Sequence, residues 1–525
     1  MLLMNKRVLT LLLSCLLLWA VVAAPASAAA PDPNLSGVPG TWAPGATPSN
    51  LNPNYPVILF VQGLTANAGT WYETNDMYQT AYNNGYQTAF VELYDSGGPS
   101  KNMWDNGKLL ADKIVEISKA FPGKKLVIVA HSKGGVDSQT ALVHYGAYPY
   151  VSHVITLGSP HHGSQLADLA YSDWAGWLAD LIGYKTEGTY SMQTSYMNYF
   201  RSITDSHANV SKNKIYTFAG DGWHDSSPIY LIGGLYLSKF GSNDGVVTVT
   251  SAHNPKGTMV KIGPWDHKVV HNGTPMFPLI KPYLAASAGL AAEAEGGSAG
   301  QSAARETNPL DRVQPGSTLI RGGKHESIAV ERFLVENDVR SITFDWIADQ
   351  PADRLELIAP NGEKRTLDVK VEQDQELFKN GWHHTAVVAK PEQGEWTLQA
   401  QSKKPGAHLL TVQYDSALSD SLKLTTQDKQ KFRVEADGSG LSSNKLNVRY
   451  NVSFIPEQGN PGKKQVQSLK KQAVAGANNE LDLTAAQEPG VYQTSVEVQG
   501  ATAQGAPFER SLLRSVYVDK QGGRH

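Results

Sequence analysis

The stretch Val127–Gly135, VIVAHSKGG, is an apolar run that ends abruptly in a polar triplet centred on Ser132. The apolar residues favour a buried strand, and the following GGVDSQTALVHYG is typical of a helix. A serine on such a tight strand-to-helix turn needs small residues two positions away on either side, as Ala130 and Gly134 are. The pattern predicts an exposed, nucleophilic serine, and the alternative is an ordinary loop with a capping serine.

Similar apolar runs recur on both sides of this stretch, between residues 56 and 263. They include PVILFV, YQTAFVEL, VSHVITLG, IYTFAG and TMVKIG. Longer segments between them, such as WDNGKLLADKIVEISKAF, carry apolar residues at helical spacing. Buried strands that alternate with helices predict a mostly parallel sheet with helices on both faces.

The sequence changes character after this region. Residues 284–308 are mostly Ala, Gly and Ser, which predicts a linker. Beyond it, short alternating runs such as SITFDWIA are separated by turns such as APNGEK, which is typical of β-sandwiches. His383 and His384 are predicted to be surface residues. The predicted organisation is a signal peptide (1–28), an α/β domain (50–285), the linker (286–308), a β-sandwich (309–417) and a second, Ig-like β-sandwich (418–525).

The N-terminus has the pattern of a secretory signal. Lys6 and Arg7 precede an apolar run that ends in PASAAA, with a cleavage site after about Ala28. The run is shorter than the roughly 20 residues of a membrane helix, which is the alternative. Cys15, the only cysteine, lies inside it, so a secreted mature chain has no disulfides; a lipoprotein cysteine is the other interpretation. A net charge of −3 argues against a nucleic-acid partner.

An activated serine requires a base and an acid that orients the base. Asp244, in GSNDGVV, is the favoured acid, and His267, in WDHKVVHNG, is the favoured base on the loop after the last strand of the region. The alternatives are Asp221 and Asp225 for the acid and His271 and His253 for the base.

The negative oxygen that forms on an attacked carbonyl needs preorganised backbone donors. Lys133, directly after the serine, offers its N–H at a helix N-terminus. Leu64 offers a second N–H on the loop after PVILFV, where Gly63 allows close approach. The charge of Lys133 is expected at the mouth of this site.

The motifs PVILFVQGL, AHSKGG, TLGSPHHGSQLADL, SNDGVV and WDHKVVHNG stand in an order and spacing that resembles the secreted bacterial triacylglycerol lipases and esterases. The resemblance covers about residues 50–285 and implies an α/β-hydrolase fold followed here by all-β domains. It implies Ser132 as nucleophile, Asp244 as acid and His267 as base, with the amides of Leu64 and Lys133 as oxyanion donors.

The chain departs from this family at several positions. Gln62 stands where a histidine is usual, and Lys133 stands where Gln or Met is usual. Members with a structural calcium have an aspartate at the position of Val269, so no calcium is expected. His161 and His162 lack the carboxylates of the zinc-binding subgroup, so no metal or cofactor is expected.

The segment QLADLAYSDWAGWLADLIGY places Trp174, Trp177 and Leu178 at helical spacing. We interpret them as a lid or a wall of the substrate pocket, and the alternative is core packing. The predicted function is that of a secreted lipase or esterase acting on lipid or other esters, including at an interface. Alternatives are an extracellular aliphatic polyester depolymerase and a surface-binding protein with a degenerate hydrolase domain. The β-domains are candidates for binding polymer or a cell surface.

Overall fold

The structure is a computed structural model. It describes residues 33, 35–223, 226–285, 314–374, 378, 380–436, 441, 446–457, 473–474 and 480–525. The predicted signal peptide with Cys15, the predicted linker and the alternative acid Asp225 lie outside these residues.

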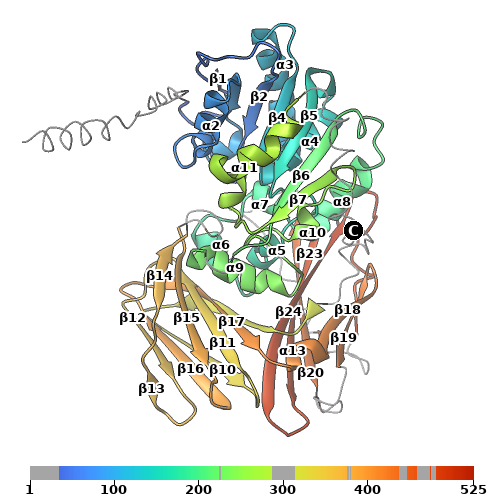
Figure 1. The fold of residues 1–525 in the computed structure, drawn as a ribbon. Coiled ribbons are helices and arrows are strands. Elements are labelled where there is room, and N and C mark those ends of the chain that lie inside the picture. The colour runs from blue at the N-terminus through green and yellow to red at the C-terminus, as the bar shows by residue number, and fades with distance from the viewer. Residues whose placement is uncertain are drawn as a thin grey trace, which may run out of the picture.

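A mostly parallel sheet forms the centre of the N-terminal half (Figure 1). Its seven strands, among the residues described, run in the order β1-β3-β2-β4-β5-β6-β7. Only β1 is antiparallel to its neighbour. The bounds are β1 (Trp42–Pro44), β2 (Val57–Val61), β3 (Thr88–Val91), β4 (Leu126–His131), β5 (Val151–Leu157), β6 (Lys214–Gly220) and β7 (Thr258–Gly263).

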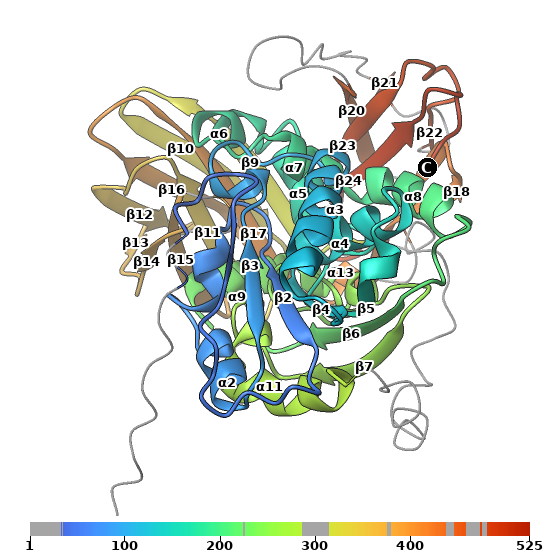
Figure 2. The ribbon, with the colours of Figure 1, turned by 90° about the horizontal axis from the view of Figure 1, so that it is seen from above.

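Helices cover both faces of this sheet, because alternate residues of the buried strands point to opposite sides. Val57 and Leu59 of β2 pack with helices α3 (Met103–Ala120) and α4 (Lys133–Val143). Ile58 and Phe60 pack on the other face with α2 (Met77–Asn83) and α11 (Gly273–Ile280), as Figure 2 shows from above. The predicted α/β fold class is confirmed. The shorter helices of this half are η1 (Ala68–Trp71), η2 (Tyr94–Ser96), η3 (Tyr148–Tyr150), α10 (Val249–Ala252), η4 (Val269–His271) and η5 (Lys281–Tyr283).

The C-terminal half consists of antiparallel sheets, which confirms the all-β prediction. One pair of sheets, β10-β16-β12-β13 and β14-β15-β11-β17-β9, encloses Trp346 and Trp396. A second pair, β22-β19-β18-β8 and β21-β20-β23-β24, encloses Tyr450 and Phe508. The bounds are β8 (Gln314–Pro315), β9 (Thr318–His325), β10 (Ile328–Val335), β11 (Ser341–Ala348), β12 (Arg354–Ile358), β13 (Lys364–Arg365), β14 (Lys370–Gln373), β15 (Trp382–Ala389), β16 (Gly394–Gln401), β17 (Gly406–Asp415), α13 (Leu418–Ser421), β18 (Leu422–Asp428), β19 (Lys431–Ala436), β20 (Asn447–Pro456), β21 (Ala473–Val474), β22 (Glu480–Asp482), β23 (Gly490–Ala501) and β24 (Pro507–Val518).

The domain boundaries stay a prediction, although the sheets separate close to residue 417. β17 ends the first pair and β18 begins in the second, with α13 between them. The exception is β8, which precedes the first pair in sequence but pairs with β18 of the second.

A layer of helices lies between the central sheet and the β-domains (Figure 1). It contains α5 (Gln165–Ala170), α6 (Gly176–Leu181), α7 (Glu187–Ser191), α8 (Thr194–Thr204) and α9 (Pro228–Ser238). Leu178 and Tyr190 of this layer share one buried apolar cluster with Leu409 and Leu513 of the β-domains. The two halves of the protein are therefore joined by a continuous core.

The prediction that His383 and His384 are surface residues is wrong, since both are buried in β15. His383 donates to Asp345 (2.7 Å) and to Asp374 (3.1 Å). Burial alone lowers the pKa of His383, but these two carboxylates raise it to about 10. The pair of carboxylates makes a buried, charged histidine stable here. Within the described part of the chain, no helix has both the length and the apolar character needed to cross a membrane.

Candidate active site

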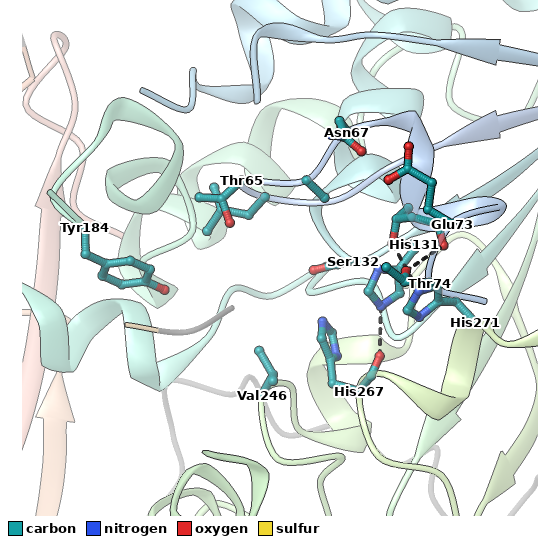
Figure 3. Close-up of a pocket in the computed structure, with 13 residues that line it drawn as sticks. Thr65, Asn67, Glu73, Thr74, His131, Ser132, Tyr184, Val246, His267 and His271 are labelled. Atoms are coloured by element: carbon teal, nitrogen blue, oxygen red, sulfur yellow. Dashed lines mark hydrogen bonds between the residues drawn. The ribbon is translucent and has the colours of Figure 1, made fainter. Parts of the chain in front are cut away.

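The loops that follow β2, β4 and β7, together with the segment after β6, converge at the carboxyl ends of the parallel strands. This edge of an α/β sheet is where ligands commonly bind. A cavity of about 340 Å³ lies there, and Leu64, Ser132, Val246 and His267 line it (Figure 3).

Ser132 occupies the turn between β4 and α4, with a φ of 53° and a ψ of −134°. A non-glycine residue in this region is strained and is held there only by its surroundings. Its N–H donates to the carbonyl of Leu157 (3.0 Å). A Cβ on Gly134 would lie 2.3 Å from the carbonyl oxygen of Gln62. The glycine two positions after the serine is thus required by the close approach of the neighbouring loop.

Asp244 and His267 come from separate loops and form a buried pair. His267 Nδ1 lies 2.8 Å from Asp244 Oδ2. The other carboxylate oxygen accepts from the N–H groups of Val246 (2.9 Å) and Val247 (2.7 Å), which fix its orientation. Because Nδ1 is engaged by the carboxylate, the ring presents Nε2 to the side of the cavity where Ser132 lies (Figure 3).

The loop after β2 lies directly against the serine. A Cβ on Gly63 would lie 2.7 Å from Ser132 Cβ, so only glycine fits without displacement. Thr65, further along this loop, has a left-handed φ of 57°. Gln62 is buried, with its side-chain amide 2.9 Å from Ser96 Oγ. Its side chain contacts Ser96, on the segment after β3, and does not line the cavity.

The expectation that the charge of Lys133 lies at the mouth of the site is wrong. Its side chain is fully buried and lies outside the cavity lining. The ammonium group donates to Asp137 (2.9 Å) and Asp95 (3.2 Å). Burial alone lowers the pKa of Lys133, but these two carboxylates more than offset it and raise the pKa.

His131 has a structural role that the sequence did not reveal. Its Nε2 lies 2.9 Å from the carbonyl oxygen of His267, to which the neutral ring donates (Figure 3). Its ring stacks on His271 with centroids 3.9 Å apart. Burial lowers the pKa of His131 well below 6.5, and the neighbouring His271 and His267 lower it further. His131 is therefore neutral and helps to fix the backbone of His267.

The alternative acid and bases lie in different surroundings. His271 lines the cavity, and burial lowers its pKa to about 3. It contacts Thr70 Oγ1 (3.4 Å), and the charged or hydrogen-bonding neighbours that shift its pKa are His267 and Lys268, neither of which is a carboxylate. Asp221 is exposed, and His253 follows α10 outside the cavity lining.

The three residues predicted to bind substrate, Trp174, Trp177 and Leu178, are not among those that line the cavity. Trp174 and Leu178 are buried in the cluster shared with the β-domains. Trp177 is 49% exposed, and the ammonium of Lys324 in β9 lies 4.9 Å from its ring centroid. The apolar stripe therefore packs against the β-domains in this structure.

The β-domains also reach the rim of the cavity. Tyr184 lines the cavity, and its ring centroid lies 5.2 Å from that of Phe378. A second hollow of about 390 Å³ shares Thr65, Asn67 and Tyr184 with the first, and Asn380 of the β-domain forms part of its wall.

The described residues contain no group of three or more His, Cys, Asp or Glu side chains arranged to hold a metal ion. His161, one of the two histidines compared above with the zinc-binding subgroup, is buried and hydrogen-bonded to Asn254 (3.1 Å) and Thr156 (3.3 Å).

Comparisons with known proteins agree with this architecture. Residues 95–174 match the family model of the PGAP1-like α/β domain. The crystal structure of the propeptide form of Bacillus licheniformis lipase BlEst2 is 34% identical, with a TM-score of 0.76. The match covers 93% of this chain and 99% of that one. The mature form of the same lipase is 47% identical over 47% of this chain and 99% of that one, with a TM-score of 0.45. The chain belongs to the bacterial lipase and esterase family of the α/β-hydrolase fold that includes this Bacillus lipase.

Proposed function

We propose that this hydrolase cleaves carboxylic esters through a triad of Ser132, His267 and Asp244. The observation that carries the proposal is the 2.8 Å contact between His267 and Asp244, next to a serine held on a strained turn at the same cavity. A serine, a histidine and an oriented carboxylate in this relation form the general arrangement of serine hydrolases.

The chemistry follows from the positions of these groups. His267 Nε2 takes the proton of Ser132 Oγ, and the oxygen attacks the ester carbonyl. The N–H groups of Leu64 and Lys133 donate to the developing negative oxygen. His267 then protonates the departing alcohol, which leaves an acyl group on Ser132. Water, deprotonated by His267, then attacks the acyl carbonyl, and His267 returns the proton to Ser132 Oγ as the acid leaves. Asp244 stabilises the imidazolium in both steps.

We propose further that the β-domains restrict access to this cavity. The Bacillus lipase that matches nearly the whole chain is a propeptide form. In this chain, Phe378 packs on the cavity-lining Tyr184, and the β-domains cover Trp174 and Leu178. Removal of the β-domains is expected to uncover the stripe and widen the entrance. Secretion, predicted from the N-terminus, brings the chain to extracellular proteases.

The test uses hydrolysis of p-nitrophenyl acyl esters by the purified full chain. Ser132→Ala and His267→Ala are expected to remove nearly all activity while the thermal unfolding curve stays that of a folded protein. If His267→Ala retained activity and His271→Ala lost it, the base would be His271. An unchanged rate in Ser132→Ala would reject the assignment altogether.

A series of acyl chain lengths, soluble and emulsified, separates esterase from lipase. Limited proteolysis of the same samples, with fragments identified by mass, tests whether activity rises as the β-domains are lost. Aliphatic polyester film is included as a substrate to test the alternative of a depolymerase. Binding of inactive Ser132→Ala protein to that film tests the surface-binding alternative.

A further inference from the structure

The two proposed oxyanion donors belong to different parts of the fold. Leu64 lies on the loop after β2, and Lys133 is the first residue of α4. Such donors must lie about 2.7–3.1 Å from the position of the developing negative oxygen. Their separation must therefore be fixed, and among the described residues no backbone hydrogen bond joins Leu64 directly to Lys133.

The side chain of Lys133 turns away from the cavity and into the protein. It is fully buried, and its ammonium contacts Asp95 (3.2 Å) and both oxygens of Asp137 (3.1 and 2.9 Å). Asp137 stands one turn further along α4, so that contact stays within the helix. Asp95 belongs to η2, after β3, so that contact joins α4 to another part of the fold.

Asp95 continues this connection to the oxyanion loop. Its Oδ1 accepts a long hydrogen bond from the N–H of Thr65 (3.4 Å), which is shared with Ser100 Oγ (3.2 Å). Thr65 follows Leu64 and has the left-handed φ of the loop's bend. Asn106 donates to both Asp95 and Asp137 and so holds the two carboxylates around the ammonium.

We propose that Lys133 and Asp95 form a positioning pair that fixes the separation of the two oxyanion donors, one through α4 and the other through Thr65. The inference rests on the proposed function. The lysine contributes its amide to the reaction and its buried side chain to the geometry of the opposite donor. A charge-assisted contact is stronger than a neutral one, which suits a contact that must hold a fixed distance.

A merely structural ion pair would affect folding but not the reaction rate of the folded enzyme. The two roles are separated by a comparison of kcat and KM. Loss of a positioning pair weakens binding of the transition state and leaves binding of the neutral ester nearly unchanged, so kcat falls while KM stays close to that of the wild type.

The experiment measures p-nitrophenyl acetate hydrolysis by full-length variants that show a cooperative thermal transition. Asp95→Asn keeps the shape of the side chain and removes its charge. The double variant Asp95→Asn/Lys133→Met removes both charges, so it leaves no unpaired buried ammonium. Asp137→Asn is the matched control, because it removes a carboxylate from the same ammonium and leaves the Asp95 contact in place.

We expect Asp95→Asn and the double variant to lower kcat by about 10- to 100-fold, with KM within about twofold of the wild type. This loss is at most that caused by removing one oxyanion donor outright. The two losses should be similar, because partners that act as a unit are not additive. Asp137→Asn should lose at least about tenfold less than the double variant.

The inference is overturned if the double variant keeps kcat within about twofold of the wild type, or if Asp137→Asn loses as much as Asp95→Asn. Ser132→Ala is assayed in parallel. If it is inactive while the double variant is fully active, the proposed function stands and only the positioning role fails. If it is active, the proposed function itself fails.

Discussion

Gly63 offers a sharp test of the proposed nucleophile, since the loop after β2 leaves no room for a side chain beside Ser132. In Gly63→Ala the new Cβ would lie 2.7 Å from Ser132 Cβ and 3.3 Å from Ser132 Oγ. Carbon atoms in contact normally lie about 3.5–4.0 Å apart, so the loop or the serine must shift by about 1 Å. A misplacement of that size lowers a catalysed rate by roughly 100-fold.

The assay is the initial rate of p-nitrophenyl acetate hydrolysis by the full chain, with a thermal unfolding curve for each variant. The 100-fold loss corresponds to about 2.7 kcal/mol of transition-state stabilisation. Gly323→Ala is the matched control, because a Cβ there meets no atom within 4 Å. If folded Gly63→Ala kept kcat within about threefold of the control, Ser132 would not be the reacting group, or the loop would yield without displacing its donor.

Three further predictions concern the neighbouring polar groups. Asp244→Asn is expected to lower kcat by about 10⁴-fold with the fold intact, and a normal rate would assign the acid elsewhere. His131→Phe keeps a ring to stack on His271 but removes the donor to the carbonyl of His267; we expect kcat to fall by about tenfold and the free energy of unfolding to fall by about 1 kcal/mol. Burial raises the pKa of Asp137 from 3.8 to about 7 despite the neighbouring ammonium. Between about pH 4 and pH 7 the folded chain therefore holds a proton on Asp137 that the unfolded chain has lost. This proton's contribution to stability is full below about pH 4 and is lost as the pH rises to about 7. Urea unfolding at pH 4.5 and 7.5 should show this loss in the wild type and a smaller one in Asp137→Asn; equal losses would contradict the assignment.

The sequence was most informative where neighbouring residues alone determine the structure. The apolar run before Ser132 and the small residues around it predict a strand, a tight turn and a helix, because the constraint lies within nine residues. The fold class followed from repetition of the same pattern. The order of the strands and loops also brought Asp244 and His267 to one edge of the sheet, where they form their contact.

The sequence was least informative where a side chain depends on a partner far along the chain. From the sequence, Lys133 is predicted to be an exposed cation, because its partner Asp95 lies 38 positions away. His383 is predicted to be a surface residue because its partner Asp345 belongs to another strand. The apolar stripe with Trp174 is interpreted from the sequence as a lid or a pocket wall, because periodicity shows an apolar face but not which surface covers it.

The apolar cluster shared by the helical layer and the β-domains determines what is exposed when the β-domains are removed. Leu178 and Tyr190 belong to the same buried cluster as Leu409 and Leu513, so separation of the two halves transfers both faces into water. That transfer is unfavourable in proportion to the apolar area exposed. If the β-domains are removed, as we propose, the catalytic half exposes this apolar face beside its cavity. Adsorption to an oil droplet or a plastic film would cover the face again. Attachment to such a surface would then follow release, driven by the same apolar face that kept the intact chain together.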